Sequence, residues 1–248
     1  MWKTLLRLNR CIEIMHYMLT RPFERYAFRL VIHLPFSAFH FRPLFLNEVY
    51  MALGLWEPYV RKTLTLRRGD ALVDVGAHIG YHTLYASRRV GTSGSVIAIE
   101  PDERNLALLR KNTGAAKASN VQILEAAAGL GNTLYLLPCE NPLYTKTVGR
   151  IEAGDLGEVN SIPLDRLMAS LSFGRHSNIF LKIDVEGSEL DVIRGGLSFI
   201  KTYHPTIIVE SWNHTLLQQT LAEAGYDCIR LFAFYYRCVP AEETPSSN

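Results

Sequence analysis

The stretch that most constrains the fold is "ALVDVGAHIGYHTLYAS", residues 71–87. It begins as a nearly continuous apolar run, which is typical of a parallel strand buried on both faces. Gly76 and Gly80 follow, and the apolar spacing then changes to that of a helix over residues 79–89. A strand that passes through a glycine turn into a helix predicts the start of a βα unit.

The same alternation continues along the chain. Further helices are predicted over residues 101–114, 188–200 and 215–224, and two segments around a polar loop at 138–158 predict a hairpin or edge insertion. The segments predicted as strands are "SVIAIE", "VQILEAA", "NIFLKIDVEG", "TIIVES", "YDCIRL" and "FYYRCV". Repeated βα units predict an α/β fold in which a mostly parallel sheet has helices on both faces.

The first quarter of the chain differs from the rest. Leu5, Leu8 and Ile12 fall on one face of a helix, so residues 1–65 are predicted to be a helical N-terminal extension. A length of 248 residues with 48% hydrophobic content suits one α/β domain with such an extension. We therefore expect a main domain over residues 66–239 and a disordered tail over 240–248.

Charge is unevenly distributed. Residues 1–70 carry 11 Lys and Arg against 5 Asp and Glu, whereas the whole chain has a net charge of only +2. The small net charge does not indicate a nucleic-acid partner. The basic, aromatic-rich first quarter predicts either a cap packed on the main domain or a surface that touches lipid or a lipid-linked substrate.

Cysteine usage and the early apolar runs bear on localisation. The four cysteines show neither a C-x-x-C spacing nor a zinc pattern, which suits a reducing compartment. Glu13 and His16 interrupt the first apolar run, so no secretory signal is predicted. The uncharged stretch over residues 30–41 is too short to span a bilayer. We expect a cytoplasmic protein, with membrane association through the basic segment as an alternative.

Five predicted strands finish in or beside a carboxylate. Acids are costly in a core, and ligands of open α/β sheets bind at the carboxyl ends of the strands, so these side chains are expected to line one crevice. The alternative is that they cap the following helices, where the helix dipole favours them. The acids are Asp74, Glu100, Glu125, Asp184 and Glu210.

The glycine turn and its neighbouring acids predict a nucleoside ligand. Gly76 permits a sharp turn, Gly80 permits close packing of the helix, and free amides of the turn are expected to face the ligand. Glu100 can accept both hydroxyls of a ribose. A dinucleotide normally requires G-x-G-x-x-G, but here Ala77 and His78 stand between only two glycines. Asp74 would repel a pyrophosphate, whereas S-adenosylmethionine carries positive charge and no phosphate.

Three stretches together resemble the FkbM family of class I S-adenosylmethionine-dependent methyltransferases: "VDVGAHIGYHTLYAS", "VIAIEPDERNLALLRKN" and "IFLKIDVEGSELDVIRGG". The resemblance implies a Rossmann-like sheet of seven strands with the last one antiparallel, and O-methylation of a small molecule. It places the methionine part of the cofactor against Asp74, Gly76, Ala77, His78 and Gly80, the ribose on Glu100, and the adenine near Glu125 and Ala126. His78 stands where related sequences often carry asparagine.

The same resemblance places Asp184 and Glu186 near the transferred methyl group and the acceptor. Either carboxylate is our first choice for the base that takes the acceptor's proton, and His82 and His214 are alternatives. Lys182 is expected to pair with a neighbouring carboxylate. Asp184 and Glu186 can also hold magnesium, but nothing in the sequence fixes a third ligand, so no metal is predicted.

The acceptor is the least constrained part of the prediction. The resemblance implies a sugar hydroxyl on a glycolipid, an oligosaccharide signal or a polysaccharide, or a hydroxyl of a macrolide or other polyketide. A nicotinamide-dependent oxidoreductase and a non-catalytic binding protein are the alternatives from other classes. Nucleic-acid methylation is not favoured, because the position of an N-P-P-Y-like stretch reads "DVEG".

Overall fold

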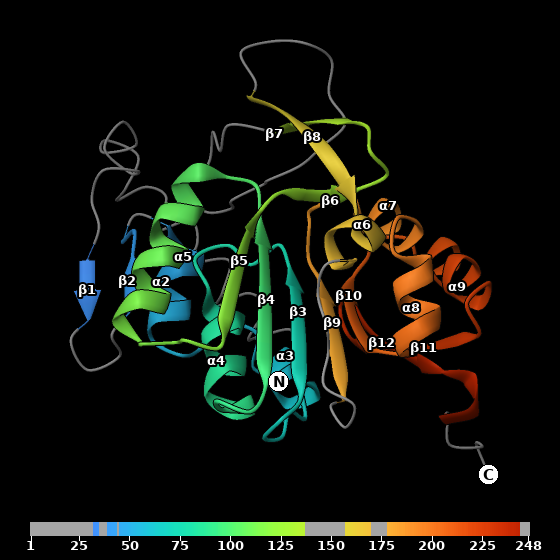
Figure 1. Ribbon diagram of the computed structural model, residues 1–248, viewed down its shortest axis with the longest axis horizontal. Coiled ribbons are helices and arrows are strands. Elements are labelled where there is room, and N and C mark those ends of the chain that lie inside the picture. Colours follow the sequence, from blue (N-terminus) through green and yellow to red (C-terminus); the bar gives the residue numbers. More distant parts are fainter. Residues whose placement is uncertain (1–31, 35–38, 44, 137–156, 170–177, 244–248) are drawn as a thin grey trace, which may run out of the picture. The chain divides into compact units, whose positions relative to one another are not determined.

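A computed structural model describes residues 32–34, 39–43, 45–136, 157–169 and 178–243 (Figure 1). The chain divides into two compact units, of which one comprises residues 1–56 with 138–146 and the other the remainder. The described part of the first unit contains strands β1 (Ile32–Leu34) and β2 (Phe39–Phe41), paired antiparallel, and helix α2 (Leu46–Ala52). The helix predicted around Leu5 and the tail beyond residue 243 lie outside the described residues.

The second unit is built on a seven-stranded sheet with the order β11-β12-β10-β9-β3-β4-β5 (Figure 1). Five neighbouring strands are parallel, and β12 is antiparallel to both of its neighbours. The predicted seven-stranded, mostly parallel sheet with an antiparallel last strand is therefore confirmed. The strands are β3 (Ala71–Val75), β4 (Ser95–Glu100), β5 (Val121–Glu125), β9 (Ile179–Ile183), β10 (Thr206–Glu210), β11 (Tyr226–Phe232) and β12 (Tyr235–Pro240).

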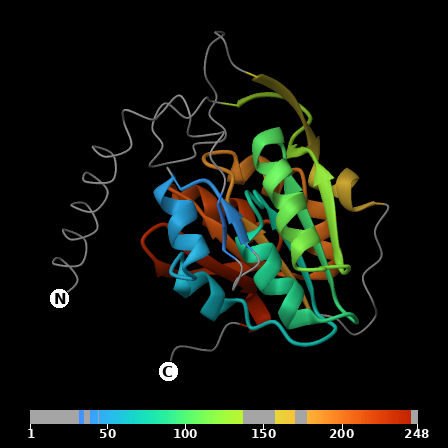
Figure 2. The ribbon, with the colours of Figure 1, turned by 90° about the vertical axis from the view of Figure 1, so that its left-hand side faces the viewer.

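Helices cover both faces of this sheet, and Figure 2 views it from the β5 edge. Helices α3 (Pro58–Thr63), α4 (Tyr81–Val90) and α5 (Glu103–Ala115) pack on one face. The other face is covered by α6 (Leu164–Met168), α7 (Glu189–Arg194), α8 (Leu197–Tyr203) and α9 (His214–Ala222).

The prediction of one helix over residues 188–200 was wrong, because α7 and α8 are separated at Gly195 and Gly196. A Cβ atom at Gly195 would lie 2.0 Å from the carbonyl oxygen of Gly129. The break therefore accompanies a close backbone approach that only glycine permits.

Alternation along the strands decides which side chains lie on which face. Val73 of β3 joins the larger buried cluster, together with apolar side chains of α7, α8 and α9. Leu72 and Phe180 point the other way, into the cluster that α3 and α4 complete. Asp74 and Lys182 have the same parity as Leu72 and Phe180, so they lie under α3 and α4.

A small three-stranded sheet carries the predicted insertion. Strands β7 (Thr133–Leu136) and β8 (Gly157–Pro163) pair antiparallel, as the hairpin prediction required, and β6 (Ala127–Gly129) pairs parallel with β8. The loop between β7 and β8 lies outside the described residues. Cys228 and Cys238 face each other across β11 and β12 and form a disulfide, which the cysteine spacing did not predict.

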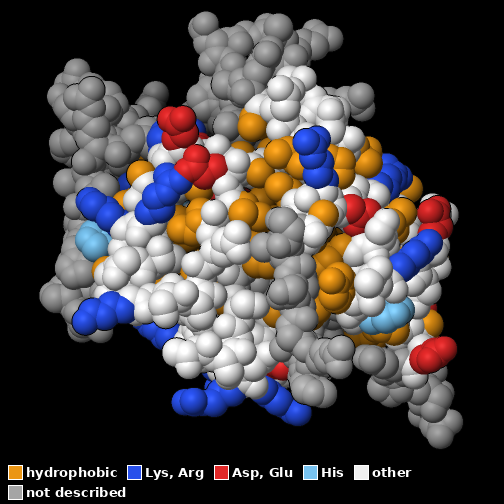
Figure 3. Space-filling model, viewed as in Figure 1, with side chains coloured by type: hydrophobic (Ala, Val, Ile, Leu, Met, Phe, Trp, Pro, Cys, Tyr) orange, Lys and Arg blue, Asp and Glu red, His pale blue; other side chains and the backbone are white. Residues whose placement is uncertain are grey.

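On the side viewed in Figure 3, hydrophobic side chains of the described residues are grouped across the middle of the face, and most Lys and Arg side chains lie around its periphery. Within the same described part of the chain, none of the helices has both the length and the apolar character needed to cross a bilayer.

Candidate functional site

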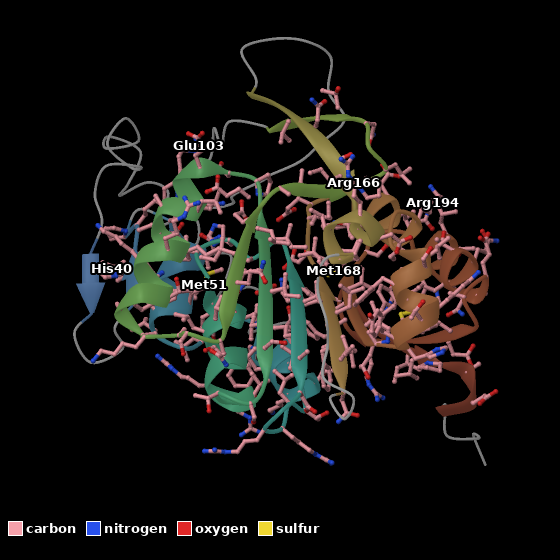
Figure 4. All side chains as sticks on the ribbon, viewed as in Figure 1. His40, Met51, Glu103, Arg166, Met168 and Arg194 are labelled. Carbon is pink, nitrogen blue, oxygen red and sulfur yellow. A yellow bond between two sulfur atoms is a disulfide. The ribbon has the colours of Figure 1, made fainter. Side chains whose placement is uncertain are left out.

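The carboxyl ends of β3, β9 and β10 bring a group of charged side chains together. The strand register places Asp74 beside Lys182, and Lys182 beside Ile208. Glu210 is two residues after Ile208 on β10 and therefore points to the same face of the sheet. Figure 4 labels Glu103, in the first turn of α5, at the edge where the neighbouring β4 ends. Parallel strands share this edge, so the acids that the sequence placed at strand ends converge there.

Lys182 lies at the centre of the group and is only 2% exposed. Its Nζ atom is 3.3 Å from Asp74 Oδ1 and 3.4 Å from Asp184 Oδ2, which confirms the predicted pairing. Burial by itself lowers the pKa of Lys182, but the two carboxylates outweigh burial and raise the pKa above its ordinary value. The ammonium group is therefore charged, and it neutralises part of the negative charge around it.

Asp74 is directed into the protein. It is 1% exposed, and its Oδ2 atom accepts a 2.7 Å hydrogen bond from Thr83 Oγ1 of α4, while Oδ1 faces Lys182. This carboxylate therefore ties α4 to β3 and to the buried lysine. The partners of Asp74 among the described residues are Thr83 and Lys182, which both lie inside the protein.

The pKa values of Asp184 and Glu210 are shifted in opposite directions. Burial raises the pKa of Asp184, but Lys182 and a hydrogen bond from Glu210 outweigh burial and hold the pKa below its ordinary value. Burial and the charge of Asp184 raise the pKa of Glu210 to about 9. At neutral pH Glu210 is therefore the protonated partner and Asp184 the carboxylate. The hydroxyl oxygen of Tyr235 lies 3.3 Å from Asp184 Oδ2.

Glu57, His82 and Tyr235 extend this group, and sequence reasoning missed the first and the last of them. Glu57 Oε1 accepts a 2.5 Å hydrogen bond from the Tyr235 hydroxyl, and Glu57 Oε2 lies 3.0 Å from His82 Nε2. Glu57 holds a left-handed conformation, with φ of 41°, at the start of α3. It lies 178 positions from Tyr235 in the sequence, so no local pattern announces the contact.

The two histidines proposed as alternative bases lie in different surroundings. His82 is buried and joins the group through Glu57. His214 is exposed, and its ring stacks on Tyr236 with centroids 4.9 Å apart. Tyr235 and Tyr236 are consecutive strand residues and point to opposite faces of the sheet. His214 is therefore on the wrong face to act with Asp184.

Glu100 forms a second buried anchor at the end of β4. Its carboxylate accepts hydrogen bonds from the backbone amides of His78 at 2.8 Å and Asp102 at 3.0 Å, and from Asn105 Nδ2 at 3.2 Å. Burial raises the pKa of Glu100 to about 7, although these hydrogen bonds oppose the rise. The carboxylate is thus fixed beneath the glycine turn.

The amides of the glycine turn are used internally. Gly76 and Ala77 both donate to the Ile99 carbonyl oxygen at 3.0 Å, Gly80 donates to Ala77, and His78 donates to Glu100. The expectation that free amides of these residues face a ligand was therefore wrong. Gly80 packs closely against helix α5, because a Cβ atom there would lie 2.7 Å from a side-chain carbon of Leu109.

An apolar hollow opens beside Gly76 and next to Glu100. Ala126 lies in it, as predicted for an adenine contact, whereas Glu125 forms an ion pair with Arg110 of α5 at the surface. The side chains that line the hollow are mostly apolar. The lining residues are Val75, Gly76, Ile99, Pro101, Ala126, Ala127, Ala128, Val185 and Ser188.

Glu186 completes a set of three carboxylates. Oxygen atoms of Asp184, Glu186 and Glu210 lie within 4.8 Å of one another, so the structure supplies the third oxygen that the sequence did not fix. Lys182 Nζ lies 3.4 Å from Asp184 and offsets part of the negative charge of this set.

Gly76→Ala is expected to lower the free energy of unfolding by about 2–4 kcal/mol. Gly76 has φ of +79°, and a Cβ atom would lie 1.9 Å from the Asp184 carbonyl oxygen, so the turn and β9 would have to separate. Urea unfolding measures the change. Gly114→Ala is the matched control, because Gly114 in α5 has open space around its Cβ position and alanine there should stabilise by about 0.5–1 kcal/mol. Equal stability of Gly76→Ala and the parent would contradict the tight contact.

Glu210→Gln is expected to change the pH dependence of stability. With a pKa of about 9 in the folded protein against 4.5 ordinarily, Glu210 keeps a proton that the unfolded chain has lost. The free energy of unfolding therefore falls as pH rises through that window, and glutamine removes this part of the fall. Urea unfolding across the window measures it, with the exposed Glu223→Gln as control. If the free energy of unfolding of the parent and of Glu210→Gln depends on pH in the same way, Glu210 does not keep a proton in the folded protein.

The sequence of this chain is similar to those of known methyltransferases. The model of the Methyltransferase FkbM domain matches residues 74–228. A Beauveria bassiana (strain ARSEF 2860) protein named Methyltransferase 1 is 29% identical over 143 residues, which cover 50% of this chain and 57% of that protein.

Two solved structures are similar to this chain. The methyltransferase FkbM of Methylobacillus flagellatus KT has a TM-score of 0.46 at 22% identity, covering 84% of this chain and 48% of that chain. A SAM-dependent methyltransferase of Aquifex aeolicus has a TM-score of 0.47 at 16% identity, covering 78% of this chain and 95% of its own. This chain thus spans about half the length of the Beauveria and Methylobacillus proteins.

Proposed function

Because the chain belongs to the FkbM family of S-adenosylmethionine-dependent methyltransferases, we propose that it transfers a methyl group from this cofactor to a hydroxyl group of a sugar. The observation that supports the proposal most is an ionised carboxylate, Asp184, which stands at the sheet edge between the apolar hollow and the polar group around Tyr235. An acceptor hydroxyl needs such a partner beside the cofactor.

The proposed cofactor site comprises the hollow and the acids beside it. S-adenosylmethionine supplies, when bound, a reactive methyl group on a positively charged sulfur. Ala126 and Ile99 offer apolar lining for its adenine. Glu100, between Ile99 and Pro101 in the sequence, is the proposed acceptor for its ribose. Asp184 and Glu186 lie where negative charge favours the sulfonium. The backbone amides of Gly76, Ala77, His78 and Gly80 already donate hydrogen bonds within the protein. The proposed role of the glycine turn is therefore to shape the surface of the cofactor site.

The proposed role of Asp184 is to orient and deprotonate the acceptor. The acceptor hydroxyl donates a hydrogen bond to the carboxylate, and its proton moves to Asp184 while the oxygen forms its new bond to carbon. Lys182, Tyr235 and Glu210 hold Asp184 ionised and in place. His82 and Glu57 act on this group through Tyr235 and are positioning residues.

The chemistry of the site favours a neutral sugar over the other acceptors. A sugar presents several hydroxyls that carboxylates and a tyrosine hydroxyl can bind, whereas a phosphate or carboxylate group would meet the charges of Asp184 and Glu186. A macrolide or other polyketide hydroxyl is the second candidate from the same class. The spread of basic side chains in Figure 3 offers no support for a nucleic-acid acceptor.

The setting of the reaction is part of the proposal. We place it in the cytoplasm, with the acceptor either free or carried on a lipid. Contact between the basic N-terminal segment and a membrane surface would bring a lipid-linked acceptor near the enzyme. That segment is largely outside the described residues, so the proposal rests on its sequence alone.

Glu100→Gln is expected to weaken the binding of S-adenosylhomocysteine about 10–100-fold, because charge-assisted hydrogen bonds to the ribose are lost. Isothermal titration calorimetry measures the dissociation constant. Glu103→Gln is the matched control, since Glu103 is an exposed glutamate three residues away (Figure 4) and should leave affinity unchanged. Unchanged affinity in Glu100→Gln would mean that the cofactor site is elsewhere.

The acceptor class is tested with methyl-labelled cofactor. The parent chain is incubated with neutral tetrasaccharides, acidic oligosaccharides, fractionated glycolipids and polyketide aglycones, and labelled products are separated. We expect label on neutral sugars. Label on the aglycones alone would replace the sugar proposal by the polyketide alternative while leaving methyl transfer intact.

A further inference from the structure

Two aromatic side chains form an exposed stack at the same edge of the sheet. Trp212 is 66% exposed and Phe234 is 38% exposed. Their ring centroids are 3.7 Å apart, and the ring planes differ by 29°. The pair therefore presents a broad, flat apolar surface to solvent.

The stack is continuous with the acid group. Trp212 follows Glu210 by two residues, and Phe234 immediately precedes Tyr235, which pairs with Glu210 across β10 and β12. The amide of Ser211 donates a 2.8 Å hydrogen bond to the Phe234 carbonyl oxygen, which fixes the two short connections against each other. The stack of Trp212 and Phe234 therefore adjoins the carboxylate of Glu210 at the end of β10.

Further aromatic rings pack around Tyr235. Tyr59 of α3 lies 4.8 Å from Phe232 and 5.2 Å from Tyr235 between ring centroids. The Tyr235 hydroxyl at the end of this series contacts Asp184 and Glu57. Aromatic faces and hydrogen-bonding groups therefore alternate along the β10–β12 end of the sheet.

Packing in the folded chain does not account for the stack. Most of the surface of Trp212 stays in water, so the residue contributes little of the burial that stabilises a fold. Tyr203, another exposed aromatic residue of the second unit, contacts Phe199 in a tilted arrangement, with ring centroids 5.2 Å apart, rather than in a close stack. Stacked exposed aromatics beside a polar cleft are typical of a ligand-binding surface.

We propose that Trp212 and Phe234 form the acceptor subsite, a platform on which the apolar face of a neutral pyranose ring lies. This inference deepens the proposed function and rests on it. The C–H groups of one sugar face pack on the aromatic surface, and the hydroxyls at the ring's edge reach the carboxylates around Glu210 and Asp184. The adjacent negative charges of Asp184 and Glu186 select against a phosphorylated or acidic sugar in this position.

Kinetics with labelled cofactor and neutral tetrasaccharides test the subsite. Trp212→Ala is expected to raise KM for the sugar about tenfold, the equivalent of one aromatic stack, with kcat and cofactor affinity little changed. Trp212→Phe retains a flat ring and should recover most of the loss. Tyr203→Ala is the matched control, because Tyr203 is a 40% exposed aromatic residue at the amino end of β10, the opposite edge of the sheet.

A second readout does not depend on turnover. With S-adenosylhomocysteine bound, addition of the methylated tetrasaccharide should shift the tryptophan emission of the parent, and Trp212→Phe should abolish the shift while calorimetry still detects binding. Trp212→Ala should lose the calorimetric signal.

The outcomes separate the two proposals. Transfer to a neutral sugar with the same KM in Trp212→Ala and the parent would overturn the platform and leave the proposed function standing. Transfer only to acidic sugars would overturn the platform and leave a sugar as the acceptor, whereas transfer only to polyketide aglycones would overturn both the platform and the sugar acceptor. Retained cofactor binding and an unchanged melting temperature show that the variant is folded.

Discussion

Asp184→Asn is expected to lower kcat by about 10²–10⁴-fold, the range that a positioned base contributes. The amide cannot take the acceptor's proton, and it no longer orients the hydroxyl as a carboxylate does. Lys182 keeps Asp74 as a partner in this variant, so the fold should survive. A labelled-methyl assay at saturating cofactor and acceptor measures kcat, and calorimetry with S-adenosylhomocysteine should show nearly unchanged affinity.

Asp191→Asn provides the control for this experiment. Asp191 is a partly exposed aspartate in α7, seven residues along the chain, and its contact with Arg194 is a weak surface pair at 3.9 Å. Loss of its charge should leave kcat within about twofold of the parent, because exposed pairs are worth little. Full activity of Asp184→Asn would remove Asp184 from the base role and direct attention to Glu186.

Lys182→Met is expected to lower the free energy of unfolding by about 3–5 kcal/mol, the usual effect of removing one partner of a buried ion pair. Methionine fills a similar volume but leaves Asp74 and Asp184 without their shared cation. Two buried carboxylates then repel each other, or one of them takes up a proton. Urea unfolding at neutral pH measures the loss, and Lys201→Met, at an exposed position of α8, should be near neutral.

A second substitution distinguishes electrostatics from packing. Adding Asp74→Asn to Lys182→Met removes one of the two stranded charges, so the double variant should be more stable than the sum of the single effects predicts. Additive effects would show that the lysine stabilises the protein through its hydrocarbon stem instead. In either case the lysine's pairing also sets the ionisation of Asp184, so Lys182→Met should lose turnover as well as stability.

The candidate site combines groups from both ends of the second unit. Glu57 begins α3, Asp184 follows β9, and Tyr235 begins β12. The hydroxyl of Tyr235 contacts both carboxylates, so movement of β12 or α3 would change the surroundings of the proposed base. Such a site depends on the whole sheet being formed, which explains why substitutions at Gly76 and Lys182 are expected to affect both stability and activity.

Much of the fold followed from local pattern. The apolar run before Gly76, the helix after Gly80 and the acid at the end of each strand are properties of short segments, and period-two or helical spacing reports them directly. The mostly parallel sheet then follows from general rules of α/β folds, and its antiparallel last strand from the resemblance to one family. Asp184 and Glu100 are candidates because each lies at the end of a predicted strand, and Ala126 is a candidate because of the family resemblance.

The sequence by itself determined the strands, the glycine turn, the acids at the sheet edge and the family. Only the tertiary structure decided that Asp74 turns inward to Lys182, that Glu57 meets Tyr235, that Glu210 holds the proton of the acid pair, and that Trp212 is exposed. Local spacing encodes which face of a segment is apolar. The partner and charge state of a polar side chain depend on burial and on neighbours far along the chain, which only the assembled sheet brings within reach.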